Sequence, residues 1–173
     1  MTTVVLSLGA NLGDRRAALS TAVEALRPVK VSNVYETPPW GDDDQPTYYN
    51  IAMIAHDPDR SATEWLELAN SCEQAAGRVR DPARRFGPRV LDVDIIAAWH
   101  ESGEPIFCGS ENLTLPHPRA HRRAFVLVPW LSIDSEAAIP GKGRVRDLLR
   151  DPDLAADART LRRLGGLESK HDA

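Results

Sequence analysis

Two aspartates, Asp92 and Asp94, lie one residue apart in the apolar run VLDVDII. Its period of two predicts a strand in which Leu91, Val93 and Ile95 face a core while both aspartates point to the opposite face. Carboxylates held side by side raise one another's pKa unless a cation lies between them. Mg²⁺ suits this position because it binds one or two carboxylates together with water and substrate phosphates. The run also fits a half-buried strand with a solvated acidic face, and the residues alone leave both interpretations open.

Five arginines stand directly before this strand, in the loop GRVRDPARRFGPR of residues 77–89. Arginine binds phosphate oxygens in a bidentate manner, because its planar guanidinium matches their geometry. An acidic pair that suits a divalent metal, next to several phosphate-binding side chains, makes phosphoryl or nucleotidyl transfer the first hypothesis for function.

An aromatic and an amide side chain are expected side by side on a strand predicted over residues 48–55. The alternation places Tyr48 and Asn50 on one face, with Tyr49 and Ile51 on the other. Tyrosine and asparagine together can stack on and hydrogen-bond a flat heterocycle. A packed tyrosine beside a turn-supporting asparagine is the structural alternative.

Two further polar residues have unusual positions. His117 lies between two prolines, on a stiff extended segment that leads into a second arginine cluster, where either ring nitrogen can contact a phosphate. Glu73 lies in the last turn of a predicted helix, where a carboxylate interacts unfavourably with the helix dipole. This position suggests that Glu73 pairs with a neighbouring arginine. A structural or exposed histidine and a solvated glutamate are the simpler alternatives.

Strands and helices alternate around these residues. Asp14 is a suitable N-cap for the first helix, Ser61 and Glu64 form a capping box for the second, and Gly77 ends that second helix. Strands are expected at residues 3–8, 29–36, 48–55 and 90–98, with a short edge strand near residue 107. Helices are expected at residues 14–26, 61–76, 119–130 and 144–150.

The length of 173 residues fits one domain, so residues 1–150 are expected to form a single catalytic domain and residues 151–173 a surface helix or a frayed tail. The net charge of −4 argues against a protein that coats nucleic acid or a membrane surface. No segment approaches the ~20 apolar residues that span a bilayer, and the N-terminus lacks a signal-peptide pattern. Cys72 and Cys108 have neither zinc nor disulfide spacing. A soluble protein of a reducing cytoplasm is expected.

Four stretches taken together resemble one family. They are LSLGANLGDR, VYETPPWG followed by QPTYYN, GRVR followed by RFGPRVLDVDII, and LTLPHPRAHRRAFVL. In order and approximate spacing they resemble the 6-hydroxymethyl-7,8-dihydropterin pyrophosphokinases of folate biosynthesis, over roughly residues 3 to 130. The resemblance implies a ferredoxin-like α+β fold, an antiparallel sheet with helices packed mainly on one face.

The resemblance also implies transfer of the terminal diphosphate of ATP to the hydroxymethyl oxygen of the pterin, leaving AMP. Two Mg²⁺ ions are then expected at Asp92 and Asp94, with Asp94 near the attacking hydroxyl. The implied partners are ATP and the pterin alone, without nucleic acid or membrane, and the chain is expected to be a monomer.

The family's site residues carry over by position in this sequence. The residues implied at the nucleotide are Glu73, Arg78, Arg80, Arg89, Ile95, His117 and Arg123. The residues implied at the pterin are Thr37, Pro38, Trp40, Tyr48, Asn50, Phe86, Asp92, Arg123 and Phe125. The pterin ring is expected to stack between Tyr48 and Phe125. Arg78, Arg89 and Asp94 are the implied catalytic residues, and the loop at 77–88 is expected to close over ATP.

The arginine loop departs from the family's common pattern. Phe86 stands where members often have tryptophan, which keeps stacking but removes an indole N–H donor. The loop is one residue longer, so either Arg84 or Arg85 takes the position before the aromatic. Pro118 follows the histidine and removes any side-chain hydrogen bond at that position.

Two other classes of function stay open from the residues. Ferredoxin-like domains also bind nucleotides or RNA without catalysis, and an arginine loop beside aromatic residues can stack bases. A Mg²⁺-dependent nuclease would use the same aspartates, but it has no need of a separate pocket at Tyr48, Asn50 and Phe125.

Overall fold

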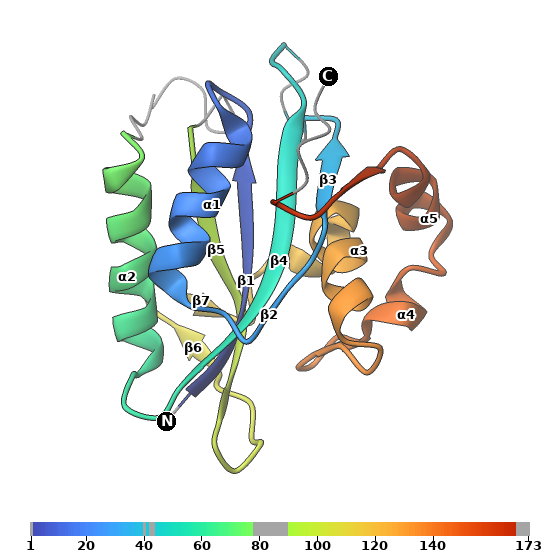
Figure 1. Ribbon diagram of the computed structural model, residues 1–173. Coiled ribbons are helices and arrows are strands. Elements are labelled where there is room, and N and C mark those ends of the chain that lie inside the picture. Colours follow the sequence, from blue (N-terminus) through green and yellow to red (C-terminus); the bar gives the residue numbers. More distant parts are fainter. Residues whose placement is uncertain (1, 40, 42–43, 78–89, 169–173) are drawn as a thin grey trace.

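The computed structural model of the chain describes residues 2–39, 41, 44–77 and 90–168, and its centre is an antiparallel sheet (Figure 1). The strands of this sheet are β1 (Thr2–Ala10), β2 (Lys30–Val31), β3 (Val34–Thr37), β4 (Tyr48–Asp57), β5 (Asp92–His100) and β10 (Arg162–Gly165). Their order is β10-β3-β4-β1-β5, and β2 also pairs with β4. The longest strands, β1, β4 and β5, therefore lie next to one another in the middle and at one edge.

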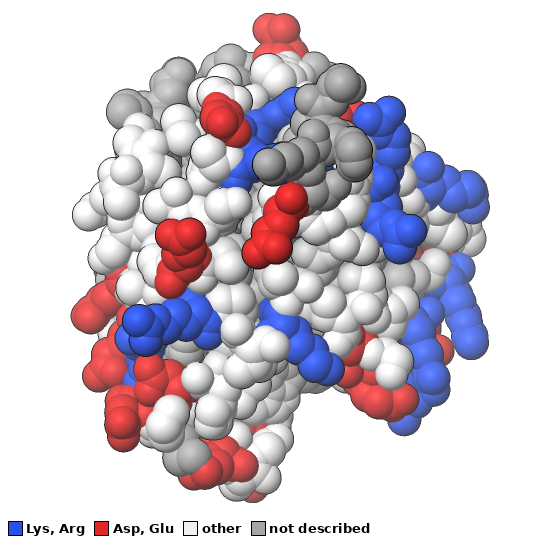
Figure 2. Space-filling model, in the orientation of Figure 1, with Lys and Arg blue, Asp and Glu red and all other residues white. Residues whose placement is uncertain are grey.

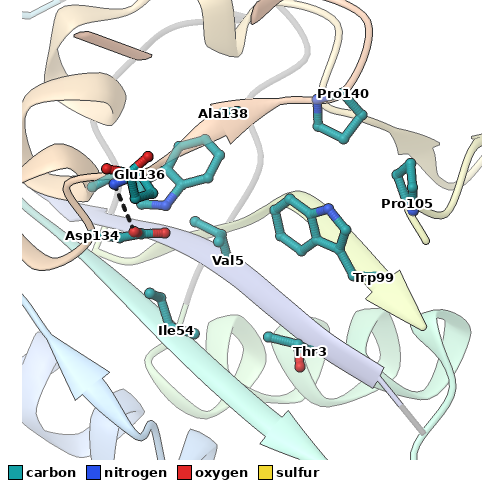
Figure 3. A pocket seen from close by; sticks show the side chains of 10 residues that line it. Thr3, Val5, Ile54, Trp99, Pro105, Asp134, Glu136, Ala138 and Pro140 are labelled. Carbon is teal, nitrogen blue, oxygen red and sulfur yellow. Dashed lines mark hydrogen bonds between the residues drawn. The ribbon is translucent and has the colours of Figure 1, made fainter. Parts of the chain in front are cut away.

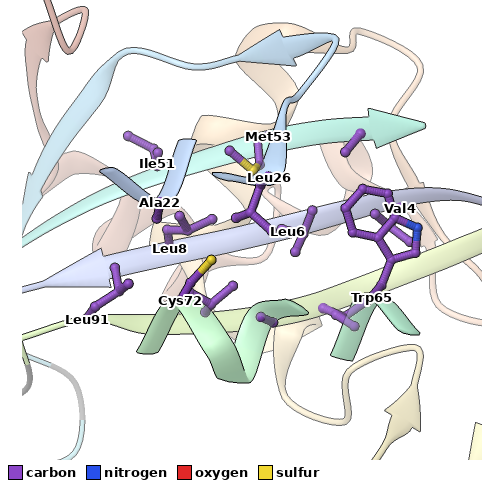
Figure 4. Close-up of a cluster of buried hydrophobic side chains, with 14 of the residues drawn as sticks. Val4, Leu6, Leu8, Ala22, Leu26, Ile51, Met53, Trp65, Cys72 and Leu91 are labelled. Carbon is purple, nitrogen blue, oxygen red and sulfur yellow. The ribbon is translucent and has the colours of Figure 1, made fainter. Parts of the chain in front are cut away.

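Helices α1 (Arg15–Leu26) and α2 (Ala62–Ala75) cover one face of the sheet (Figure 1). Figure 4 shows the core on this face, where Leu6 and Leu8 of β1 meet Leu26 of α1 and Trp65 of α2. Truncating one such buried leucine to alanine typically costs about 2–5 kcal/mol. This core therefore fixes β1 relative to both helices.

The opposite face of the sheet is covered by α3 (Ala124–Ile133), α4 (Val145–Leu148) and α5 (Pro152–Arg159). The alternation along β1 separates the faces, since Val4 and Leu6 belong to the first core while Val5 packs with Leu127 and Trp130 of α3. Helix α3 reads AFVLVPWLSI and is apolar on nearly all sides, so it can be buried between the sheet and the other two helices.

The expected α+β fold class with an antiparallel sheet is confirmed, but helices cover both faces of the sheet and not mainly one, because α3, α4 and α5 pack in the second core. The order β1, α1, β3, β4, α2, β5, with both helices on one face, is the arrangement of a ferredoxin-like α+β domain. Two small hairpins complete the described chain, and their strands are β6 (Cys108–Gly109) with β7 (Thr114–Leu115), and β8 (Ala138–Ile139) with β9 (Gly143–Arg144). Both hairpins connect segments of the domain without joining the main sheet.

Three element boundaries differ from the sequence prediction for local reasons. The strand expected at residues 29–36 is divided into β2 and β3, because the Ser32 hydroxyl accepts from the Ala52 N–H at 2.9 Å in place of a ladder carbonyl. The strand expected at 90–98 is β5, and the register of its pairing with β1 shifts between Val5 and Leu6. The helix expected at 119–130 begins at Ala124, after a 3₁₀ turn at 120–122.

The C-terminal segment joins the main sheet. Residues 151–173 were expected to form a surface helix or a frayed tail; the described part is α5 followed by β10, which pairs with β3. Arg16 of α1 holds this strand by donating to the carbonyl oxygens of Gly166 at 2.8 Å and Leu164 at 3.4 Å. The strand RRLG is too short for its alternation to be recognised in the sequence.

We expect the Ser61→Ala variant to lower the free energy of unfolding by about 1 kcal/mol. The Ser61 hydroxyl accepts from the Glu64 N–H, and the Glu64 carboxylate accepts from the Ser61 N–H. Urea denaturation measures this change. The control is Ser71→Ala in the same helix, whose hydroxyl only donates to the Glu67 carbonyl one turn earlier and whose loss should be near neutral. Equal effects at both serines would contradict the capping role.

Candidate active site

Asp92 and Asp94 lie on the sheet face that also carries α3. Across the β1–β5 pair, Asp92 is opposite Gly9 and Asp94 is opposite Ser7, and both aspartates are half-buried. Leu91, Val93 and Ile95 belong to the core on the other face, so the predicted alternation is confirmed. The two carboxylates therefore stand about 7 Å apart along one strand and on one side of it.

Gly9 lets β4 bring an amide next to these carboxylates. Gly9 is paired on its other side with Asn50, and a Cβ at Gly9 would lie 2.5 Å from the Asn50 Oδ1 and 3.3 Å from the Tyr48 ring. Neither contact can be accommodated without a shift of these side chains. The absence of a side chain at this position thus allows Asn50 and Tyr48 to lie over the backbone of β1.

Asn50 is oriented from the opposite direction by β3. It is 4 % exposed, and its Nδ2 donates to the Thr37 Oγ1 at 2.6 Å. Thr37 is buried as well, while Pro38 is exposed at the end of β3. Tyr48 is half-buried beside them and pairs with Thr37 across the strands. The face prediction for Tyr48 and Asn50 is confirmed, and the amide is held in one orientation.

The N-terminus of α3 brings a cation to the same region. Arg123 is the residue before the first turn of α3 and is 8 % exposed. Its Nη1 lies 3.9 Å from the Asp94 Oδ2, and its guanidinium carbon lies 5.5 Å from the centre of the Phe125 ring. Phe125 is half-buried in the first turn of α3. Arg123 therefore links the aspartate pair to the second aromatic residue expected at the site.

His117 is attached to the edge of β5 and is held neutral. Its backbone N–H donates to the Ile96 carbonyl at 2.8 Å, and its Nδ1 accepts from the Arg119 N–H at 3.1 Å. Burial, followed by the charge of Arg123, lowers the His117 pKa from 6.5 to about 4, although Asp92 acts in the opposite direction. With Nδ1 accepting, the proton resides on Nε2, which can donate to an anionic oxygen.

The remaining expected residues divide into two groups. Glu73 is 5 % exposed near the C-terminal end of α2, and Ile95 is buried in the first core, so its side chain faces away from the aspartates. The other expected residues lie outside the described residues, and they are Trp40, Arg78, Arg80, Arg84, Arg85, Phe86 and Arg89.

Sequence reasoning missed the residues of β1 and α1 that support the site. Asn11, in the turn after β1, is 3 % exposed, and its Nδ2 donates to the Gln45 Oε1 at 2.9 Å and to the Pro46 carbonyl at 3.0 Å. Arg15 donates to the Thr47 carbonyl at 3.0 Å. The one available signal was Gly9, directly after the strand expected at residues 3–8, since a glycine in or next to a strand can mark a close approach of another segment.

The aspartate pair has the donor chemistry of a magnesium site. Among the described residues, no group of three or more His, Cys, Asp and Glu side chains is placed to enclose a metal ion. Two hard carboxylate donors on one partly open face suit an ion that keeps water and substrate oxygens in its remaining positions. They do not suit zinc, which needs three or four protein ligands.

Comparison with known proteins identifies one family. The model of the 7,8-dihydro-6-hydroxymethylpterin-pyrophosphokinase family matches residues 5–135. The chain belongs to this family. Every described site residue that the sequence predicted lies within the matched range.

Relatives in this pyrophosphokinase family cover most of the chain. The 2-amino-4-hydroxy-6-hydroxymethyldihydropteridine pyrophosphokinase of Mycobacterium tuberculosis is 41% identical over 99% of this chain and 96% of its own length. The Mycobacterium leprae protein of the same name is 51% identical over 84% of this chain and 79% of its own length. That of Bacillus subtilis is 38% identical over 74% of this chain and 75% of its own length.

Solved structures agree in fold. A structure described as HPPK-DHPS in complex with substrates has a TM-score of 0.66 at 10% identity and is matched over 94% of this chain. Wild-type Plasmodium falciparum HPPK-DHPS has a TM-score of 0.64 at 11% identity over the same share. The present chain spans about half the length of these chains, 46% and 48% respectively.

We expect the Gly9→Ala variant to be destabilised by about 1–3 kcal/mol, because the new methyl group displaces the Asn50 amide and breaks its bond to Thr37. Urea denaturation measures the stability, and NMR of the Asn50 side-chain amide reports the displacement. Gly109→Ala is the matched control, since its Cβ would meet no atom within 4 Å. Equal destabilisation of both variants, or an unshifted Asn50 amide, would show that the close approach at Gly9 is unimportant.

His117 should make stability depend on pH. Because the folded-state pKa, about 4, is below the ordinary 6.5, the unfolded chain takes up a proton first as pH falls. The contribution of His117 to the free energy of unfolding is therefore complete above pH 6.5, and it is lost as pH falls from 6.5 to 4. Between pH 7.5 and pH 5, the wild type should lose more free energy of unfolding than His117→Gln does, as measured by urea titrations at both values. Equal losses would contradict the lowered pKa.

Proposed function

We propose that the chain transfers the diphosphate of ATP to the hydroxymethyl oxygen of 6-hydroxymethyl-7,8-dihydropterin, giving AMP and the pterin diphosphate. The observation that carries this proposal is the meeting of four features on one sheet face. These features are the Asp92 and Asp94 carboxylates, Arg123, the Asn50 amide and Tyr48. Gly9 of β1 separates Asn50 of β4 from Asp92 of β5. A metal-nucleotide half and a heterocycle half are thus adjacent.

The pterin half consists of Tyr48, Phe125, Asn50 and the end of β3. The pterin ring stacks between the two aromatic side chains. The Asn50 Oδ1 and the backbone that follows Thr37 read the polar edge of the ring, and Asn50 is suited to this because Thr37 already fixes its Nδ2. A ring bound in this way has its hydroxymethyl group directed toward Asp92 and Asp94.

The nucleotide half consists of the aspartate pair, Arg123, His117 and Glu73, together with the Ile95 backbone and the arginines at 78, 80 and 89; the Ile95 side chain lies in the core on the other face. Asp92 and Asp94 would hold two Mg²⁺ ions, which when bound neutralise the phosphate oxygens and draw charge from the reacting phosphorus. Arg123 lies 3.9 Å from Asp94, and its guanidinium can stabilise the negative charge that develops on a phosphate group during the reaction. The neutral His117 donates from Nε2 to a phosphate oxygen.

In the reaction the pterin hydroxymethyl oxygen attacks the β-phosphorus of ATP. A bond forms between these two atoms, and the bond from the β-phosphorus to the oxygen that bridges the α- and β-phosphates breaks. That oxygen leaves as part of AMP, and the hydroxyl proton is released near the Asp94 carboxylate. The protein contributes mainly by positioning the two substrates and neutralising charge, because phosphoryl transfer needs little covalent chemistry from side chains.

We further propose that the protein acts as a monomer in the cytoplasm, with its catalytic residues within residues 1–150 and the loop at 77–88 closing over ATP. No helix in the described ranges is long and apolar enough to cross a membrane. On the face seen in Figure 2, acidic and basic side chains are interspersed among the described residues. Together with the net charge of −4, this distribution favours small anionic substrates bound at a local site over RNA bound along a basic surface.

Release of AMP from ATP and Mg²⁺ tests this function. AMP should form only when 6-hydroxymethyl-7,8-dihydropterin is present, and Asp94→Ala should lower its rate by at least about a hundredfold, as when a metal-holding group is removed. Asp157→Asn, an exposed carboxylate of α5, is the control and should keep the wild-type rate. No AMP from the wild type with pterin, or an Asp94→Ala variant as active as the control, would refute the assignment.

A further inference from the structure

A pocket of about 410 Å³, drawn in Figure 3, lies on the α3 side of the sheet. Thr3 of β1 and Trp99 of β5 line it. Trp99 follows Asp94 by five residues in the same strand, which places the pocket roughly 17 Å along the sheet from the aspartate pair. None of the residues that line it belongs to the expected substrate site, so the pocket is separate.

The pocket has an apolar floor and an aromatic wall. Val5 and Ile54 form the floor, and Figure 3 shows them between the two sides of the pocket. Trp99 forms one wall and is half-buried, with its ring centre 6.4 Å from that of the fully buried Trp130. The contact with Trp130 fixes the Trp99 indole, which presents a flat apolar surface to a ligand.

The opposite wall is acidic. Figure 3 shows Asp134 and Glu136 across the pocket from Trp99. The Asp134 Oδ1 accepts from the Glu136 N–H at 3.0 Å, which holds the Asp134 carboxylate in place. The described residues that line the pocket include these two carboxylates and no basic side chain.

A nearby arginine does not neutralise this wall. The Arg144 Nη1 lies 3.8 Å from the Glu136 Oε2, but the two side chains are 51% and 70% exposed, so solvent screens the pair strongly. Asp134 is half-buried and has no salt bridge within 4 Å among the described residues. A cation in the pocket would therefore meet a fixed carboxylate with a second one beside it.

We propose that this pocket binds a small planar organic cation, an aromatic amidine or amine. The flat ring lies over Val5 and Ile54 against the Trp99 indole, and the cationic group donates to Asp134 and Glu136. A volume of about 410 Å³ holds one such molecule. The same charges exclude phosphates, so neither ATP nor a pterin diphosphate binds here.

Benzamidine is the probe, titrated into the ¹⁵N-labelled full chain. The Trp99 indole N–H signal, assigned with the Trp99→Phe variant, should shift in a saturable manner. Benzamide and benzoate have the same ring without the positive charge, so they should bind at least about tenfold more weakly. Equal binding of the three compounds, or no shift of the Trp99 signal with benzamidine, would overturn the proposal.

Two variants locate the interaction. Asp134→Asn keeps an oxygen that can accept from the Glu136 N–H, so the fold should be retained while benzamidine binding weakens at least about tenfold. Asp94→Asn removes a carboxylate of the other site and should bind benzamidine as the wild type does. Unchanged affinity in Asp134→Asn, or weakened affinity in Asp94→Asn, would show that the probe binds elsewhere and would refute this pocket. If Asp134→Asn loses the native amide spectrum, Glu136→Gln takes its place under the same criteria.

Discussion

The double pairing of β1 is the constraint on which the site depends. β1 is hydrogen-bonded to β4 on one side and to β5 on the other along nearly its whole length, and this register places Gly9 between Asn50 and Asp92. A slip of one residue on either side would turn Asn50 or the aspartates toward α1 and α2. Such a slip is prevented by packing, because Leu6 is buried in one core and Val5 in the other. The geometry of the site is therefore a consequence of how the two faces of one strand are buried.

The parts of the fold and site that follow a local period could be predicted from the sequence. The alternation in VLDVDII was sufficient to place Asp92 and Asp94 on one face, and that of YYNI to place Tyr48 with Asn50. The capping box at Ser61 marked the start of α2 to within one residue. In each case the relevant contacts are made by residues a few positions apart, so a single segment contains the information.

The parts that depend on distant segments could not be predicted in this way. The pairing of β10 with β3 joins Arg162 to Glu36, and four residues carry too little periodicity to indicate it. The lowered pKa of His117 arises from burial and from the position of Arg123, neither of which has a local signature. The support that Asn11 gives to the segment around Gln45 likewise became visible only once the turn after β1 was placed beside it. The roles expected of Trp40 and of the arginines at 78–89 stay predictions.

The charges at Asp92 and Asp94 explain why the proposed function requires divalent cations there. Asp92 and Asp94 stand at the centre, the Arg123 Nη1 lies 3.9 Å from the Asp94 Oδ2, and His117 is neutral at physiological pH. The two carboxylates themselves repel the phosphate oxygens of a triphosphate that approaches them without a metal. Under the proposed function, the carboxylates would become favourable only when divalent ions lie between them and the phosphates, so this pair would repel free ATP and accept its metal complex. A neutral histidine suits this arrangement, because it can donate a hydrogen bond to the phosphate without competing with the metal for the carboxylates.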